Sequence, residues 1–523
     1  MKYLACQPDR SWYKSILTVS ARGSIFTLDT KSGKFGFRAH IFGVTLLGFM
    51  GLAPEEKEMK QTQTERDKKE LARLQKLAGL KKPAAFMLIT MIVLTIVYIV
   101  DEITSNMNSS MQPYALFEFF NITSRDVNSA EYKTALGTVA PISVAANFLL
   151  IVTPFYKALS DKYGRKLFLM INTVGMGVGM LVVLTAPNVA VYIIGMLLMM
   201  FFTPNDMQVL YIMETAPKEK RATYCFVAKG IALVSVSLIG VLAKIFMKSD
   251  IPSSWRMVYV VPVVMAVVIG LLSYIMLHET PVFVDERIKL LSMTEEERKS
   301  KEEREKKAGQ VEKGGVFNAI KFIFKNRQLR FIFIAGFVFY GTTFYTSYYS
   351  SVLEGAMSTD MVTTALFIYP FFNGLVTMLS GVLSDKLGRK KVCLLLGGLT
   401  LVGVLMFVLS CRLGWGPIAA GIAYGCSIGG LWSVSDTLIL TMPAESSPSS
   451  MRSSVMGTIT VMIGAGMFVG QFTFIALQNF FPMDILFLVL CVPFMLLSLV
   501  ILMTQVKETK DVDLDEITVG TYK

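Results

Sequence analysis

Five ionisable side chains lie inside long apolar stretches of this 523-residue chain: Asp101, Glu102, Asp206, Lys229 and Asp436. A charge among apolar side chains costs free energy unless it is paired or has a function. A carboxyl group in a partly dry site can bind and release a proton near neutral pH. The sequence therefore predicts that Asp101 and Glu102 carry protons, and that Asp206, Lys229 and Asp436 bind a polar solute.

Each of these assignments has a structural alternative. Asp101 and Glu102 are adjacent, so on a helix they point about 100° apart and cannot face one cavity equally; we favour Asp101 as the proton carrier. Both carboxyl groups could instead lie near water at the outer mouth of a membrane span. Lys229 could form a purely structural ion pair with Asp206.

Three aromatic side chains extend the predicted solute site. Tyr345 and Tyr349 belong to a stretch rich in tyrosine and threonine, and Trp432 lies four residues before Asp436. Aromatic rings that carry polar groups can cover a sugar face or an organic ion. They are also common at membrane interfaces, which is the structural alternative for these three.

The elements that must position these residues are membrane spans. The chain is 53% hydrophobic and only 17% charged, whereas soluble domains carry about 25% charged residues. A span needs roughly 20 mostly apolar residues, and twelve such stretches occur. In the first half they are 84–106, 134–158, 166–186, 189–213, 222–247 and 257–277. In the second half they are 329–353, 361–383, 391–411, 416–442, 453–478 and 483–504.

Charge placement predicts the orientation. The chain has a net charge of +12, and its basic residues lie in loops between apolar stretches, which argues against a nucleic-acid partner. The loops after spans 2, 4, 8 and 10 are short and basic, so the positive-inside rule places both termini and the central loop in the cytoplasm.

Other functional classes lack their signals. The six cysteines and two histidines show no metal-ligand or disulfide spacing. No nucleotide-binding loop or nucleophile–base set occurs. We therefore expect neither an enzyme nor a bound metal or cofactor.

Two loop motifs are each written twice. Residues 159–166 recur as residues 383–390, and each copy places an Asp, a Gly and an Arg at the same spacing. The glycine permits a tight turn between antiparallel helices. These residues are Asp161, Gly164 and Arg165 in the first copy, and Asp385, Gly388 and Arg389 in the second.

The second motif has Pro three residues and Arg seven residues after a Glu. It runs from Glu214 to Arg221 and again from Glu445 to Arg452. The repeat offsets are 224 residues for the first motif and 231 for the second. Two motifs in the same order at nearly the same offset predict two similar six-helix halves.

These motifs resemble those of the major facilitator superfamily, and more narrowly its sugar-porter and organic-ion-porter branch. The first motif is complete in the second half, where Gly381 precedes Asp385 by four residues, whereas Lys157 stands at that place in the first half. Residues 278–281, His-Glu-Thr-Pro, resemble the sequence that ends span 6 in that branch. The resemblance covers residues 84–505.

The resemblance implies an all-α membrane fold of twelve helices in two bundles related by a pseudo-two-fold axis. It also implies that the motif charges form clusters that latch the halves together in one state and release them in the other. The alternative is that these charges only cap helices and fix topology. The implied latch consists of Asp161, Gly164, Arg165, Glu214, Arg221, Asp385, Gly388, Arg389, Glu445 and Arg452.

The predicted organisation has five parts. They are a cytoplasmic leader at 1–83, six-helix bundles at 84–278 and 329–505, a cytoplasmic linker at 279–328 and a tail at 506–523. Within the leader, Ile41–Ala53 is apolar but too short to span a membrane, so we expect an interfacial or packed segment. Residues 55–82 carry Leu71, Leu74, Leu77 and Ala78 at helical spacing and predict an amphipathic helix.

We therefore expect a monomeric plasma-membrane carrier that takes up a small polar organic solute together with protons. An exporter of drugs or metabolites is the rival within transport. A sensor that keeps the fold and signals through the leader is the rival of another class. Substrate identity does not follow from the sequence.

Overall fold

A computed structural model of the chain describes most of its residues. The described ranges are 17–21, 24–29, 34–41, 44–49, 68–76, 84–123, 126–146, 149, 156, 159–160, 163–216, 221–248, 251–293, 297, 300, 319–447 and 452–510. The chain divides into two compact units, Met1–Gly79 and Leu80–Lys523.

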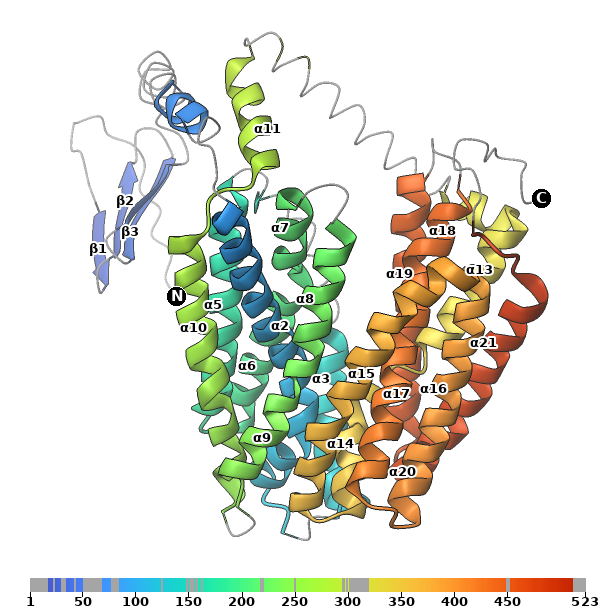
Figure 1. The fold of residues 1–523 in the computed structure, drawn as a ribbon. Helices are drawn as coiled ribbons and strands as arrows, with labels where there is room; N and C mark the ends of the chain where they lie inside the picture. The colour runs from blue at the N-terminus through green and yellow to red at the C-terminus, as the bar shows by residue number, and fades with distance from the viewer. Residues whose placement is uncertain are drawn as a thin grey trace, which may run out of the picture. The chain divides into compact units, whose positions relative to one another are not determined.

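The first unit contains a four-stranded antiparallel sheet with the strand order β1-β2-β3-β4. Its strands are β1 (Leu17–Ala21), β2 (Ser24–Asp29), β3 (Lys34–Ile41) and β4 (Val44–Phe49). Within Ile41–Ala53, Val44–Phe49 forms strand β4 and Val44 pairs with Ile41 at the end of β3. Residues 42–43 and 50–53 lie outside the described residues. Figure 1 labels the first three strands of the sheet.

A short helix covers residues 68–76 of the same unit. Leu74 is its most buried residue, Leu71 is half-buried and the lysines Lys68, Lys69 and Lys76 are exposed. This part of the predicted amphipathic stretch is therefore helical with one apolar side. Leu77 and Ala78 lie outside the described residues.

The second unit is helical, and its first half begins with a helix longer than predicted. Helix α2 runs from Ala84 to Phe119 and contains Pro113. It is followed by α3 (Ala130–Ala146), α5 (Arg165–Leu184), α6 (Val189–Phe202), η2 (Thr203–Asn205), α7 (Met207–Thr215), α8 (Arg221–Ser235), α9 (Ser237–Phe246), η4 (Pro252–Tyr259) and α10 (Val260–Met276). Helix α11 (Pro281–Ser292) lies after the sixth span.

The second half repeats this plan. Its elements are α13 (Arg327–Tyr340), α14 (Tyr345–Ala356), α15 (Thr359–Leu387), α16 (Arg389–Arg412), α17 (Pro417–Asp436), η5 (Thr437–Thr441), α18 (Met442–Glu445), α19 (Arg452–Leu477), α20 (Met483–Leu486), η6 (Phe487–Cys491) and α21 (Val492–Gln505). In each half, a glycine with positive φ, Gly164 (110°) or Gly388 (101°), makes the turn before the third span.

The predicted spans are confirmed for the part of the chain that the structure describes. There, eleven helices are long and apolar enough to cross a membrane. The predicted second span, 134–158, is described as a continuous helix only as far as Ala146. Span 1 extends to Phe119 instead of 106, so residues 107–119, which the predicted span left out, lie inside helix α2.

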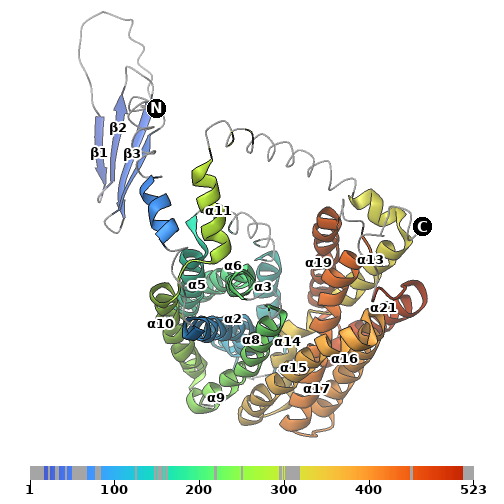
Figure 2. The ribbon, with the colours of Figure 1, turned by 45° about the horizontal axis from the view of Figure 1, so that its top comes forward.

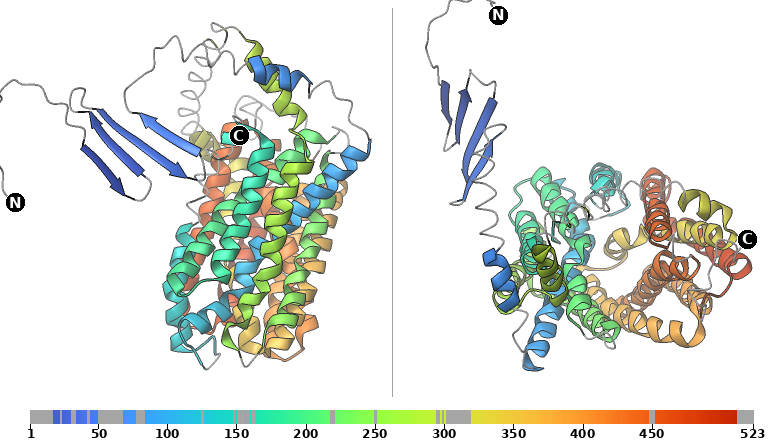
Figure 3. Two further views of the ribbon diagram at one scale, coloured as in Figure 1. Left: turned by 90° about the vertical axis from the view of Figure 1, so that its left-hand side faces the viewer. Right: turned by 90° about the horizontal axis from the view of Figure 1, so that it is seen from above.

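The two halves meet along a few helices. Helix α15 of the second half packs against α8 and α9 of the first, α14 packs against α2, and α19 packs against α3. Views along and across the helices show the two bundles side by side (Figures 2 and 3). The site described next lies between them.

Candidate functional site

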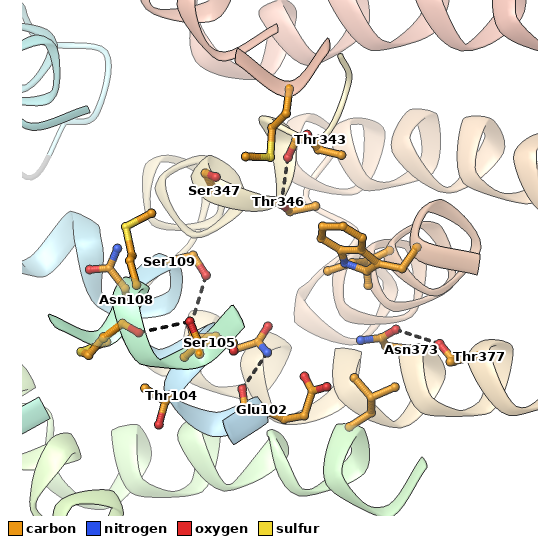
Figure 4. Close-up of a pocket in the computed structure, with 18 of the residues that line it drawn as sticks. Glu102, Thr104, Ser105, Asn108, Ser109, Thr343, Thr346, Ser347, Asn373 and Thr377 are labelled. Atoms are coloured by element: carbon orange, nitrogen blue, oxygen red, sulfur yellow. Dashed lines mark hydrogen bonds between the residues drawn. The ribbon is translucent and has the colours of Figure 1, made fainter. Parts of the chain in front are cut away.

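A cavity of about 390 Å³ lies where the two halves face each other. This volume falls in the range of small-molecule sites, roughly 300–1,000 Å³. Its walls come from α2, α6, α8, α14, α15, α17 and α19, and most lining side chains are polar (Figure 4). Spans 1, 4 and 5 of the first half and spans 7, 8, 10 and 11 of the second therefore all contribute.

Three charged side chains line this cavity: Glu102 of α2, Lys229 of α8 and Asp436 at the end of α17. Lys229 Nζ lies 3.7 Å from Asp436 Oδ2, and the two side chains are 34% and 56% exposed. The pair therefore joins the two halves across the cavity. Lys229 also has electrostatic interactions with Glu102 and Asp206.

Asp101 does not face the cavity. Its exposed fraction is 4%, and its Oδ2 accepts a hydrogen bond of 2.9 Å from Gln208 Nε2 of α7. Its Oδ1 has no hydrogen-bond partner among the described residues. Neighbouring positions point about 100° apart, and α2 turns Glu102, not Asp101, toward the cavity. The role of Asp101 as proton carrier stays a prediction.

Asp206 occupies an unusual backbone position. It has a left-handed conformation (φ 46°, ψ 38°) between η2 and α7. It is not among the cavity-lining residues, and the ion pair of Lys229 is made with Asp436 instead. The direct solute contact expected of Asp206 stays a prediction, whereas the alternative ion pair of Lys229 is made with Asp436.

The predicted tyrosines also differ from expectation. Tyr345 and Tyr349 are 0% and 1% exposed. Tyr345 Oη lies 2.6 Å from Ser427 Oγ, and the Tyr349 ring stacks on Tyr424 with centroids 4.0 Å apart. Both belong to the core of the second half rather than to the cavity. Tyr348, between them, lines the cavity together with the predicted Trp432.

A polar stripe on α2 was missed by the sequence analysis. Glu102, Ser105, Asn106, Ser109 and Gln112 all line the cavity, and Asn106 Nδ2 donates to the Glu102 carbonyl oxygen at 2.8 Å (Figure 4). Their spacing of three or four residues is that of one helix face. The signal was present in the sequence, but span 1 was predicted to end at 106, so Ser109 and Gln112 fell outside it.

Hydrogen bonds join the two halves at the end opposite the glycine turns. Ser110 and Tyr349 hydroxyls lie 2.8 Å apart. Tyr114 Oη donates to Glu354 Oε2 at 2.7 Å, and this glutamate is 8% exposed. The Tyr132 and Ser351 hydroxyls lie 2.9 Å apart. This end of the cavity is therefore closed by packed α2, α3 and α14.

The first half has a buried charge cluster at the turn before α5. Arg165 forms an ion pair with Glu214 (3.0 Å) in which both side chains are nearly buried. Glu279 Oε1 accepts backbone hydrogen bonds from Arg165 and Lys166. Thr280 Oγ1 donates to Glu214 Oε2 at 2.6 Å. The cluster thus ties together the start of span 3 and the ends of spans 4 and 6.

The second half repeats the main contacts of this cluster. Arg389 Nε pairs with Glu445 Oε1 at 3.1 Å. Glu508 Oε1 accepts from the backbone N–H of Arg389 at 2.7 Å, and Thr509 Oγ1 donates to Glu445 Oε2 at 2.6 Å. Glu508 and Thr509 were missed. Their signal was a Glu-Thr pair 229 residues after Glu279-Thr280.

The two glutamates beside the glycine turns have opposite pKa shifts. Burial raises the pKa of Glu279, although backbone N–H groups, that of Lys166 foremost, act against it. Glu508 is more open to water; burial acts to raise its pKa, but backbone N–H groups led by those of Lys390 and Lys510 lower it overall. The repeated sites are therefore electrostatically unequal.

The remaining members of the predicted latch are only partly visible. Asp161 lies outside the described residues, as do the side chains of Arg221, Asp385 and Arg452. Among the members that are described, each cluster closes within its own half.

Comparisons with known proteins give one family. The family model of the Major Facilitator Superfamily matches residues 34–241, 94–471 and 353–516. A curated protein of Staphylococcus haemolyticus, provisionally named a proline/betaine transporter, is 24% identical over 296 residues. That match covers 52% of this chain and spans 58% of the relative's length.

Solved structures share the fold. The inward-open conformation of the xylose transporter XylE from E. coli is 16% identical, with a TM-score of 0.59, and the match covers 83% of this chain and 99% of that one. A POT family transporter in complex with 5-aminolevulinic acid is 11% identical, with a TM-score of 0.51 and coverage of 79% and 94%.

Proposed function

This chain belongs to the major facilitator superfamily, and on that premise we propose that it carries a small polar organic solute across a membrane by alternating access. The observation that carries the proposal is the polar, charged cavity enclosed between two repeated halves. Binding sites at the interface of structural repeats, reached alternately from each side as the halves rock, are the usual design of such carriers.

The conformation of the second unit supports a rocking mechanism. Hydrogen bonds from Ser110, Tyr114 and Tyr132 close one end of the interface. At the other end, the ribbons of α7 and α8 diverge from those of α18 and α19 (Figure 1). Positive charge in the loops at the divergent end predicts that it faces the cytoplasm. This state is then the one that releases solute inward.

Proton coupling is assigned to the adjacent carboxyl groups of α2. Glu102 is in contact with the cavity, and Asp101 lies just behind it with one oxygen unpartnered among the described residues. Burying a carboxylate without full hydrogen bonding is costly, so a carboxyl group there gains by taking up a proton. A proton gradient across the plasma membrane would then drive uptake by a monomer.

The two charge clusters are the proposed joint between states. Each fixes the ends of three spans within one half, so each half moves as a body. Asp161 and Asp385 belong to the proposed latch at the divergent end, and ion pairs of about 1 kcal/mol each can bias such a two-state interface. Arg221 and Arg452 belong to the same proposal.

The names of similar proteins support the solute class. Xylose, proline and betaine, which appear in the names of the relative and of one solved structure, are all small and polar. The cavity has the size for such molecules but carries charges of both signs, which a neutral sugar does not use. An amino-acid-like or betaine-like solute therefore fits the lining better than a sugar.

The test is solute flux with the purified full chain in proteoliposomes. A metabolite library should reveal one class that accumulates, and accumulation should rise with an imposed inward proton gradient. Efflux against the imposed gradient would instead identify an exporter. Solute binding with no flux in either direction would contradict transport and identify a sensor.

A further inference from the structure

The charges of the central cavity point to the solute class more narrowly, and this inference rests on the proposed function of the same site. We propose that the cavity binds a zwitterion, whose carboxylate contacts Lys229 and whose cationic nitrogen contacts Glu102 and Asp436. Such a solute would insert into the ion pair that joins the two halves. Each step of the argument uses the three charged lining residues.

The first step concerns the Lys229–Asp436 pair. Its 3.7 Å separation exceeds the roughly 2.7–2.9 Å of a charge-assisted hydrogen bond between such groups. An ammonium group has three donors, so Lys229 keeps donor capacity that a solute carboxylate can use. Both side chains remain partly exposed to the cavity, at 34% and 56%. The pair is therefore loose and accessible.

The second step concerns the pairing of each charge. Glu102 and Asp436 contribute two carboxyl groups to the lining and Lys229 one cation. A solute with only a negative charge would be opposed by both carboxylates, and a solute with only a positive charge that displaced Asp436 from Lys229 would leave the ammonium group without a partner. A zwitterion satisfies both signs, and it replaces the contact between Lys229 and Asp436 without leaving either charge unpaired.

The third step concerns the rest of the wall. Trp432 lines the same cavity from the second half. Aromatic faces attract ammonium groups, including fully substituted ones that cannot donate hydrogen bonds. Because Lys229 belongs to the first half and Asp436 and Trp432 to the second, the bound zwitterion would contact both halves at once. The two charges of the zwitterion would thus connect the halves in place of the direct Lys229–Asp436 ion pair.

The test compares isosteric probes of different charge on the purified full-length protein in detergent. Glycine betaine carries both charges, choline carries only the cation, and 3,3-dimethylbutyrate carries only the carboxylate on nearly the same shape. Proline with its methyl ester, and γ-aminobutyrate with its amide, vary the spacing of the charges. Binding is measured by calorimetry and by thermal stabilisation, and glucose serves as the neutral probe.

At least one zwitterion should bind, and each of its single-charge counterparts should bind about tenfold more weakly, or about 1.4 kcal/mol. Equal binding of a single-charge counterpart, tighter binding of glucose, or no binding of any zwitterion would overturn the proposal. Binding needs no flux. If a zwitterion binds but is not transported, only the proposed transport function is contradicted. If a neutral solute is transported instead, only the proposed zwitterion specificity is contradicted.

Variants assign the two charges. Lys229→Gln should remove the preference for betaine over choline, and Glu102→Gln should remove the preference for betaine over 3,3-dimethylbutyrate. Lys244→Gln, an equal charge change on the exposed side of α9, is the matched control and should leave both preferences intact. If Lys229→Gln does not fold, the exchanged pair Lys229→Asp with Asp436→Lys keeps both signs and should still bind the zwitterion. The assignment of Lys229 to the solute carboxylate would be refuted if Lys229→Gln kept the preference for betaine over choline. It would also be refuted if the exchanged pair did not bind the zwitterion.

Discussion

Carboxyl groups that are close in the sequence of this protein have different surroundings in the structure. Asp101 and Glu102 are sequence neighbours, yet one is buried against Gln208 and the other lines the cavity. The sequence predicted that ionisable residues inside spans would gather, and Glu102, Lys229 and Asp436 do. It did not predict which pairs form, because the partners depend on how each helix is rotated against its neighbours. Lys229, for example, forms its ion pair with Asp436 and not with Asp206.

Asp101→Asn should uncouple solute movement from protons. Uptake driven by an inward proton gradient should fall by about tenfold or more, toward the rate without a gradient. Exchange of solute for solute should persist, because exchange requires no net proton movement. Both are measured as flux in proteoliposomes. Glu131→Gln, an exposed position at the start of α3, is the control. Gradient-driven accumulation at the wild-type level in Asp101→Asn would contradict the role.

Glu508→Gln should reduce the acid sensitivity of the fold. Burial acts to raise the pKa of Glu508, but the backbone N–H groups around it lower that pKa overall. A carboxyl group with a lowered pKa stabilises the folded state above its unfolded pKa, and this stabilisation is lost as pH falls through the folded pKa. The apparent Tm of the variant should therefore fall less than that of the wild type between neutral pH and about pH 4.

Glu279 is the matched comparison for that measurement. Burial raises the pKa of Glu279, so its folded form binds a proton more readily than its unfolded form, and its contribution grows as pH falls. Glu279→Gln should therefore not reduce the acid sensitivity of the Tm, and should increase it slightly. The same response from both variants would show that the two sites are electrostatically alike.

At the scale of elements, composition was a good guide wherever a helix faces lipid and a poor guide where it faces the cavity. The first span was predicted to end at 106, but polar residues beyond 106 belong to helix α2 and line an internal site, where polar side chains are tolerated within a span. The sheet at residues 17–49 was missed. Apolar side chains alternate with other residues only over short stretches, such as Lys34–Ile41. Such short stretches are a weak signal for strands.

Gly388→Ala should destabilise the turn between α15 and α16. The residue has a φ of 101°, and an added Cβ would lie 2.5 Å from Glu508 Oε2. Strain in such a backbone region costs about 1–3 kcal/mol, so the apparent Tm should fall. Gly398→Ala, inside α16 with nothing within 4 Å of its Cβ position, should leave the Tm unchanged or raise it. Equal Tm values for the two variants would contradict this account.

For the whole molecule, the interface between halves should determine which state is populated. Gly240 of α9 lies against α15, and an added Cβ would be 2.4 Å from the Phe367 backbone nitrogen. A backbone atom cannot move aside as a side chain can, so Gly240→Ala should separate α9 from α15. The variant should favour the state that is open at the end opposite the glycine turns. The expected change is a longer distance between the two halves there.

Spin labels at Thr185 and Leu413, both exposed at helix ends of opposite halves, report that distance in a background without the six native cysteines. The distribution should shift by several ångströms toward longer values, with a change in population rather than a smooth drift. Gly398→Ala is again the control. A distribution identical to that of the unsubstituted background would show that this contact does not hold the halves together.

The two repeated charge clusters have a consequence for how the polypeptide can be made. Arg165, Glu214 and Glu279 all come from before residue 293, and Arg389, Glu445 and Glu508 all come from after residue 319. The contacts of each charge cluster thus form within one bundle and do not require a covalent link to the other bundle. Two separately translated fragments, divided within residues 294–318, should therefore assemble in one cell and complement each other genetically.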